Sequence, residues 1–124
     1  MRLSESSTPS WHLSHYDHDS VTINQQRYTH SVVLNKAGVS AWDITQLSNL
    51  NEEIITSWAA LKPDIIVLGT GRLFKRPPQT VLDTCAIHEI GLEFMNTASA
   101  CRCLNILLEE KRNVTAALLI GDKS

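Results

Sequence analysis

Three thiols are the side chains of this sequence best suited to nucleophilic or metal chemistry. Cys101 and Cys103 lie two residues apart, and Cys85 stands alone. Side chains two positions apart on a helix point roughly 200° from one another, so a helix here can neither turn both thiols to one metal ion nor join them in a disulfide. Cys101 falls at helical spacing with Leu104 and Leu108, which is typical of a buried helix face. We therefore predict that these thiols pack in the core.

A histidine cluster near the N-terminus is the second pattern that could bind a metal. His12, His15 and His18 recur every third residue, with Asp17 and Asp19 among them. Nothing around them favours the helix that would bring the rings to one face, and structural zinc sites use a better-defined ligand set. We interpret the cluster as part of a solvated tail, with adventitious metal binding as the alternative. No Ser-His-Asp or Cys-His set can be drawn, so we predict no catalytic residue, no metal site and no cofactor.

A glycine-rich turn follows an apolar run that ends at residue 69. The turn Gly69-Thr70-Gly71 lacks the third glycine of a dinucleotide-binding fingerprint. One interpretation is a tight turn that needs a positive φ. The other is a small-ligand or anion site: if strands 64–69 and 92–95 are parallel neighbours, this turn lies beside residues 95–97, where ligands of open α/β sheets bind.

The amide groups that open the helix after residue 96 would face the same point and could hold an anion. Asn105 lies at the border of the apolar helix face, where its amide needs a partner. The candidate ligand-binding residues are Gly69, Thr70, Gly71, Arg72, Asn96, Thr97 and Asn105.

The loop over residues 71–78, here called the basic loop, carries an apolar pair among cations. Leu73 and Phe74 are flanked by Arg72, Lys75 and Arg76. Apolar side chains in a charged loop suit contact with another protein, and Arg72, Phe74, Lys75 and Arg76 are the candidate contact residues. The alternative is that Phe74 folds back onto the edge of the sheet.

The elements that must position these residues alternate along the second half of the chain. Helices are predicted over 51–63, 80–90 and 96–112, buried strands over 64–70 and 114–120, and a short strand over 92–95. This alternation predicts a three-layer α/β domain whose central mixed, largely parallel sheet carries helices on its faces. Short strands within 20–36 and 39–44 predict an antiparallel N-terminal hairpin region. Residues 1–11 are predicted to be a mobile tail and 12–124 a single domain.

Local signals set the expected element ends. Asn51 can cap the first helix, and Pro63 is expected to stop it. Gly91 is expected to provide the left-handed residue after the second helix.

Composition excludes several classes of protein. The 124 residues are 43% hydrophobic and carry a net charge of −2, so neither a disordered chain nor a nucleic-acid-binding protein is expected. No apolar run is long enough for a membrane span, and the N-terminus does not read as a signal or transit peptide. Three cysteines without a C-x-x-C pair suit a reducing compartment. We expect a protein of the bacterial cytoplasm.

The segments "VLGTGR" and "IGLEFMNTASACRCLNILLEEKRNVTAALLI" resemble a small domain of unknown function. This family is shared by bacterial and archaeal proteins, an adipogenesis-associated Mth-like domain protein and a mitochondrial respiratory complex I assembly factor. The resemblance covers residues 64 to 120 well, although Asn96 stands where Asp is usual. It implies a three-layer α/β fold with a mixed sheet and no established catalytic activity.

Two functional hypotheses follow. The first is a non-enzymatic protein-interaction or assembly domain whose partner is another protein, with homo-oligomers also open. The second is a small-ligand or anion-binding protein that uses residues 69–71 and 95–97, and an enzyme is one form that this second hypothesis can take.

Overall fold

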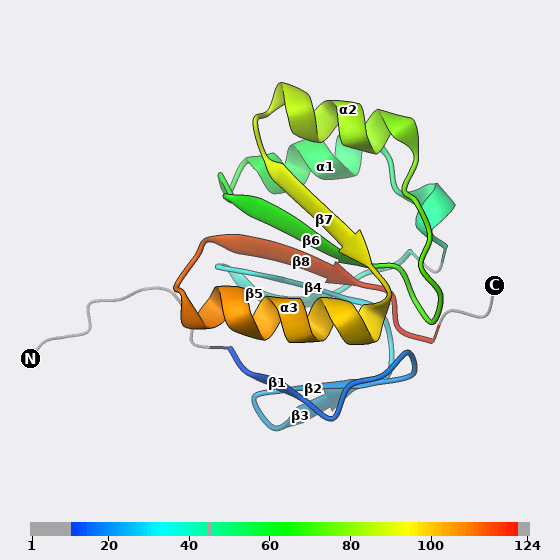
Figure 1. The fold of residues 1–124 in the computed structure, drawn as a ribbon, viewed down its shortest axis with the longest axis vertical. Helices are drawn as coiled ribbons and strands as arrows, with labels where there is room; N and C mark the ends of the chain where they lie inside the picture. The colour runs from blue at the N-terminus through cyan, green and yellow to red at the C-terminus, as the bar shows by residue number, and fades with distance from the viewer. Residues whose placement is uncertain (1–10, 45, 122–124) are drawn as a thin grey trace, which may run out of the picture.

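The structure, a computed structural model, describes residues 11–44 and 46–121, and within them it contains two β-sheets and three α-helices (Figure 1). The larger sheet has the strand order β5-β4-β8-β6-β7. Its strands are β4 (Val32–Asn35), β5 (Gly38–Ala41), β6 (Ile65–Gly69), β7 (Gly91–Met95) and β8 (Val114–Leu118). β6 pairs in parallel with both β7 and β8, while β4 pairs antiparallel with β5 and β8. The predicted mixed α/β sheet with antiparallel N-terminal strands is confirmed.

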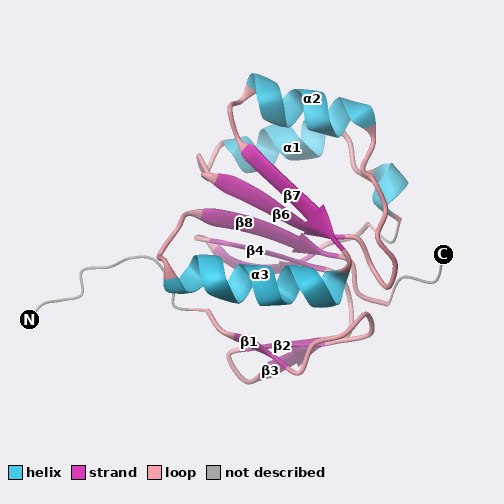
Figure 2. Cartoon of the chain, viewed as in Figure 1, coloured by secondary structure: helices cyan, strands magenta, loops and turns pink. Residues whose placement is uncertain are grey.

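Helices cover both faces of this sheet, as Figure 2 shows. They are α1 (Glu52–Ala59), α2 (Gln79–Ile87) and α3 (Thr97–Glu109), and a short 3-10 turn spans Leu47–Asn49. α1 and α2 lie on one face and α3 on the other. β8 shows why both layers are needed, because buried side chains along it alternate between the two core clusters. Ala116 and Leu118 face α3, whereas Ala117, and Leu119 directly after the strand, face α1 and α2. The continuous apolar runs in the sequence reflect this two-sided burial.

A second, smaller sheet lies against α3 and contributes Leu13, Val21 and Ile23 to the same core cluster (Figure 1). It consists of β1 (Leu13–Ser14), β2 (Val21–Ile23) and β3 (Gln26–Tyr28), paired antiparallel in that order. The turn between β2 and β3 lies at Asn24 and Gln25, which adopt φ values of 48° and 76°.

The histidine cluster is not part of a tail, although His12 and His15 are exposed to solvent as the interpretation of a solvated segment expected. Its residues surround β1, which pairs with β2 through backbone hydrogen bonds and places the side chain of Leu13 in the core. Residues 1–10 of the predicted mobile tail lie outside the described residues, and Trp11 packs against the core.

The helix ends differ from the sequence expectations in two places. Asn51 caps α1 as predicted, its Oδ1 accepting a hydrogen bond from the amide of Ile54 at 3.0 Å. The helix ends at Ala59, before Pro63, and the chain reverses at Lys62 with φ 54°. After α2 the left-handed residue is Glu89 (φ 58°), and Gly91 is instead the first residue of β7.

Candidate functional site

The two turn segments singled out in the sequence meet at one rim of the large sheet. Gly69 is aligned with Met95 in the parallel β6–β7 pair. Beyond the strands, the amide of Thr70 donates to the carbonyl of Met95 at 2.8 Å, and the amide of Thr97 donates to the carbonyl of Gly71 at 2.9 Å. The expected juxtaposition of residues 69–71 with residues 95–97 is therefore present.

The Thr97 hydroxyl joins three elements at this rim. Its Oγ1 accepts a hydrogen bond from the amide of Gly71 at 2.9 Å and donates one to the carbonyl of Leu119 at 2.8 Å. The amide of Leu119 in turn donates to the carbonyl of Gly69 at 2.9 Å. Since Thr97 is completely buried, one side chain connects the ends of β6 and β8 to the first turn of α3.

The glycines at the rim serve this close packing. A Cβ on Gly69 would lie 2.9 Å from the Oγ1 and 3.1 Å from the Cα of Thr97. Gly71 adopts a φ of 99°, which favours glycine. The tight-turn interpretation of Gly69-Thr70-Gly71 is therefore confirmed at Gly71, while Gly69 is required by the approach of α3.

Most of the polar groups at the rim form hydrogen bonds with other groups of the same chain. At the start of α3, the side chain of Asn96 accepts from the amide of Ser99 at 2.9 Å, and its carbonyl accepts from the amide of Ala100 at 2.9 Å. Thr70 and Thr97 are buried, while Arg72 is exposed. The arrangement holds the ends of the strands together, and a bound anion at this rim stays a prediction.

Asn105 does not lie with the other candidate ligand-binding residues. Its Oδ1 accepts from the amide of Leu13 and its Nδ2 donates to the carbonyl of the same residue, both at 2.9 Å. The amide at the border of the apolar face thus finds its partner in β1, and it attaches the small sheet to α3.

The basic loop leaves the rim in a fixed conformation. The hydroxyl of Thr70 donates to the carbonyl of Leu73 at 2.7 Å and accepts from the amide of Lys75 at 3.2 Å. Phe74 is 62% exposed, yet its ring stacks on Phe94 of β7 with centroids 5.7 Å apart. Phe74 therefore folds back onto the sheet edge and presents its outer side to solvent, which combines the two alternatives drawn from the sequence.

The charged part of the loop borders an open hollow of about 480 Å³. Lys75 and Arg76 line it together with Gln46, Leu47, Ser48 and Pro78. Arg76 is oriented by a hydrogen bond from its Nη2 to the Oε1 of Gln79 at 2.8 Å.

The sequence analysis did not single out Phe94, the residue on which the ring of Phe74 stacks. The signal was available, because parallel strands 64–69 and 92–95 place their carboxyl ends side by side.

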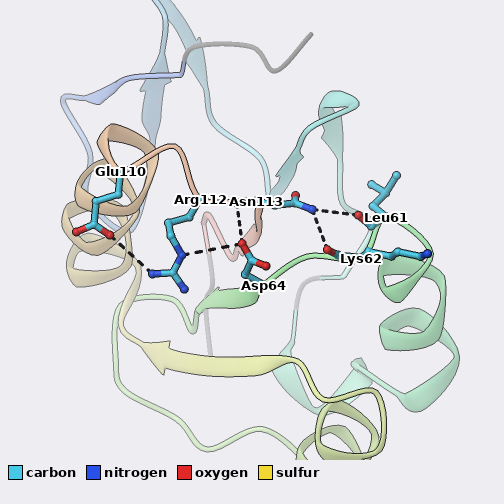
Figure 3. Close-up of polar contacts among 6 residues, drawn as sticks. All are labelled: Leu61, Lys62, Asp64, Glu110, Arg112 and Asn113. Atoms are coloured by element: carbon cyan, nitrogen blue, oxygen red, sulfur yellow. Dashed lines mark hydrogen bonds and ion pairs between the residues drawn. The ribbon is translucent and has the colours of Figure 1, made fainter. Parts of the chain in front are cut away.

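A separate polar network lies at the opposite rim (Figure 3). The Nδ2 of Asn113 donates to the carbonyls of Leu61 at 3.1 Å and Lys62 at 2.8 Å, which secures the turn between α1 and β6. Asp64 accepts from the amide of Asn113 at 3.3 Å and lies 4.0 Å from the guanidinium of Arg112. These contacts brace backbone groups and are best understood as structural.

Cys85 and Cys101 are buried in the core, as predicted, whereas Cys103 is half-buried. Burial raises the pKa of Cys101 from 9.0 to about 12, against a small lowering by the Arg102 charge. Burial likewise raises the pKa of Cys85, and burial with the nearby Glu93 carboxylate raises that of Cys103. A raised thiol pKa leaves little thiolate at neutral pH, so these groups are weak nucleophiles. Among the described residues, no group of three His, Cys, Asp or Glu side chains is placed to hold a metal ion.

Because the pKa of Cys101 is raised, the free energy of unfolding should depend on pH in the alkaline range. In the unfolded chain the thiol ionises near 9.0, whereas in the folded chain it keeps its proton to about 12. Between these values the folded state binds more protons, so the free energy of unfolding should fall as pH rises, by about 1 kcal/mol per pH unit. Urea unfolding from pH 7 to 11 measures this fall. Cys101→Ala should unfold more easily at pH 7 but show a shallower slope at alkaline pH; an unchanged slope would contradict the assignment to Cys101.

Comparison with known protein families places the fold among relatives. A family model described as "Protein of unknown function (DUF498/DUF598)" matches residues 13–119. The "13 kDa major membrane protein" of Francisella tularensis is 26% identical over 99 residues, which are 78% of this chain and 80% of that protein. The "NADH dehydrogenase [ubiquinone] 1 alpha subcomplex assembly factor 3" of Rattus norvegicus is 29% identical over 110 residues. That alignment covers 87% of this chain and 60% of the assembly factor.

Solved structures share the same architecture. An NMR structure of a Xanthomonas campestris protein superposes with a TM-score of 0.83 at 30% identity, covering 98% of this chain and 92% of that one. A crystal structure of a Bordetella parapertussis protein gives a TM-score of 0.83 at 26% identity, covering 93% and 99%. A Bordetella pertussis structure described as a Mth938-like domain shares the fold, with a TM-score of 0.76 at 22% identity over 100% and 95% of the two chains. Within the described residues, no helix combines the length and apolar composition needed to cross a membrane.

Proposed function

The chain belongs to the DUF498/DUF598 family of proteins of unknown function, and from this premise we propose that it is a non-enzymatic protein-interaction domain that acts in the assembly of other proteins. Its contact surface is the basic loop, with Phe74 at the centre and Arg72, Lys75 and Arg76 around it. Phe94 supports the centre from below.

The observation that carries this proposal is the exposure of Phe74. Leu73 and Phe74 are 53% and 62% exposed on a loop that the Thr70 hydroxyl holds in shape. Exposed aromatic and arginine side chains are enriched where proteins bind one another. Since Phe74 is already stacked on Phe94 at 5.7 Å, little side-chain freedom is lost when a partner covers it.

The relatives support the same function. Several are named as assembly factors of NADH dehydrogenase, and the chain spans about 60% of the length of the Rattus norvegicus protein. The pKa values of the three thiols are raised, which gives no support to thiol catalysis. The partner of this chain is proposed to be a protein that presents acidic and apolar groups, because the contact surface is basic around an apolar centre.

The test compares the partners that the chain retains when Phe74 is changed. The full chain, affinity-tagged and expressed in its own host, should co-purify with a stoichiometric protein, measured by quantitative mass spectrometry. Phe74→Asp should reduce that protein at least about tenfold, because central aromatic residues contribute most of the binding energy.

Ile106→Asp is the matched control. Ile106 is 59% exposed on α3, away from the basic loop, so the same substitution there should leave co-purification unchanged. The proposal fails if no stoichiometric protein is found, or if both variants lose it equally.

A further inference from the structure

An unpaired strand edge lies beside the proposed contact surface. β7 is the last strand in the order of the large sheet, and among the described residues it pairs only with β6. Figure 1 shows β7 at the margin of this sheet, next to the loop that leads from β6 to α2. Unpaired strand edges bind other chains readily, because their amides and carbonyls lack partners in the sheet.

The hydrogen bonds to β6 show which groups of β7 point outward. The amide of Gly91 donates to the carbonyl of Asp64 at 3.2 Å, and the carbonyl of Met95 accepts from the amide of Thr70 at 2.8 Å. Backbone groups alternate in direction along a strand. The amides and carbonyls of Leu92 and Phe94 therefore face away from β6, toward the open edge.

The sequence of β7 does little to block pairing. Natural edge strands are commonly protected by proline, lysine or bulges. The strand Gly91–Met95 contains neither proline nor lysine, and Glu93 is its one charged residue. The side chain of Phe94 faces the α1 and α2 layer, where Phe74 stacks on it, so an apolar platform borders the open backbone.

Resting on the proposed function, we infer that the partner adds an extended acidic segment to the outer edge of β7 as a further strand. Backbone hydrogen bonds to Leu92 and Phe94 hold the segment. Its side chains alternate between the faces, so apolar residues lie against Phe74 and Phe94. Acidic residues near the carboxyl end of β7 meet the basic loop.

A second copy of this chain fits the edge less well. If two β7 strands paired antiparallel over their full length, the symmetry axis would pass through the middle residue of each strand, so Glu93 would face Glu93 of the other copy. Two carboxylates would then lie directly opposite one another, which is destabilising. A segment with acidic residues placed toward Arg72 and Arg76 avoids this repulsion.

The inference can be tested by NMR with the full-length chain and two synthetic probes. One probe is a capped peptide that alternates valine and threonine and carries its glutamates at one end, so that they can lie near Arg72 and Arg76 rather than opposite Glu93, and the other replaces each glutamate with lysine. The acidic peptide should slow amide hydrogen exchange of Leu92 and Phe94 about tenfold or more, and it should bind at least about tenfold more tightly than the basic one.

Leu92→Pro removes an outward amide without removing a β6–β7 hydrogen bond, and proline is tolerated at strand edges. It should weaken binding of the acidic peptide at least about tenfold, whereas Leu92→Ala, which keeps the amide, should not. The exchange measurement on the unmodified chain remains decisive if Leu92→Pro does not fold.

Failure of this inference is distinguishable from failure of the proposed function. If the acidic peptide perturbs Phe74 and Arg72 without slowing exchange at Leu92 and Phe94, strand addition is overturned and the contact loop stands. Concentration-dependent dimerisation that Leu92→Pro abolishes would identify a second copy as the occupant and also overturn it. No perturbation by either peptide at millimolar concentration would reject strand addition, while the co-purification experiment would still decide the proposed function.

Discussion

Replacing Thr97 with valine is expected to lower the free energy of unfolding by about 2–4 kcal/mol. Valine has almost the shape of threonine, so the change removes two hydrogen bonds and little else. The amide of Gly71 and the carbonyl of Leu119 lose the partner that held them at 2.9 and 2.8 Å. Both groups are buried, and each unsatisfied group costs about 1–3 kcal/mol. Urea unfolding at neutral pH measures the difference.

Thr97→Ser is the matched control for this prediction. Serine keeps the hydroxyl and loses one methyl group, so it should cost only about 1 kcal/mol. The role assigned to the hydroxyl is wrong if serine and valine destabilise the chain equally, or if valine changes the free energy of unfolding by less than about 0.5 kcal/mol.

Replacing Gly69 with alanine should lower the free energy of unfolding by about 2–3 kcal/mol, because the added Cβ overfills the rim. It would lie 2.9 Å from the Oγ1 of Thr97 and 3.1 Å from the Cδ2 of Leu118. The threonine oxygen cannot move aside cheaply, because two hydrogen bonds fix it. Thermal and urea unfolding should both show the loss.

Gly91→Ala provides the comparison at another strand position. A Cβ there would meet its nearest atom, the carbonyl oxygen of Asp64, at 3.4 Å, an ordinary contact. The free energy of unfolding should change by no more than about 0.5 kcal/mol. Equal effects of the two alanines would show that close approach to α3 is not what requires glycine at position 69.

These predictions concern positions that the sequence singled out for a different reason. Residues 69–71 and 95–97 were expected to meet because parallel strands end at the same rim, and they do meet. The expected anion site depended on unpaired amides at the start of α3. The structure shows that the amides of Thr97, Ser99 and Ala100 bond within the chain, a pairing that depends on where the chain crosses the rim.

The end of α2 shows how burial can override a local signal. Glycine is the usual left-handed residue after a helix, so Gly91 was the expected position. Ile90 is buried, and its amide donates to the carbonyl of Cys85 at 2.9 Å. This closure requires the residue just before Ile90 to turn, so Glu89 adopts the positive φ.

The sequence alone determined the order of the helices and strands from residue 51, the two-sided burial of β6 and β8, and the packing role of Cys101. These follow from the spacing of apolar residues, because the hydrophobic effect acts on each segment without requiring a particular partner. The tertiary structure decided that Asn105 binds Leu13 across 92 positions of the chain, that Thr97 joins three elements and that Phe74 rests on Phe94. Such contacts depend on direction and distance between segments far apart in the sequence, and only strand register and helix packing establish those.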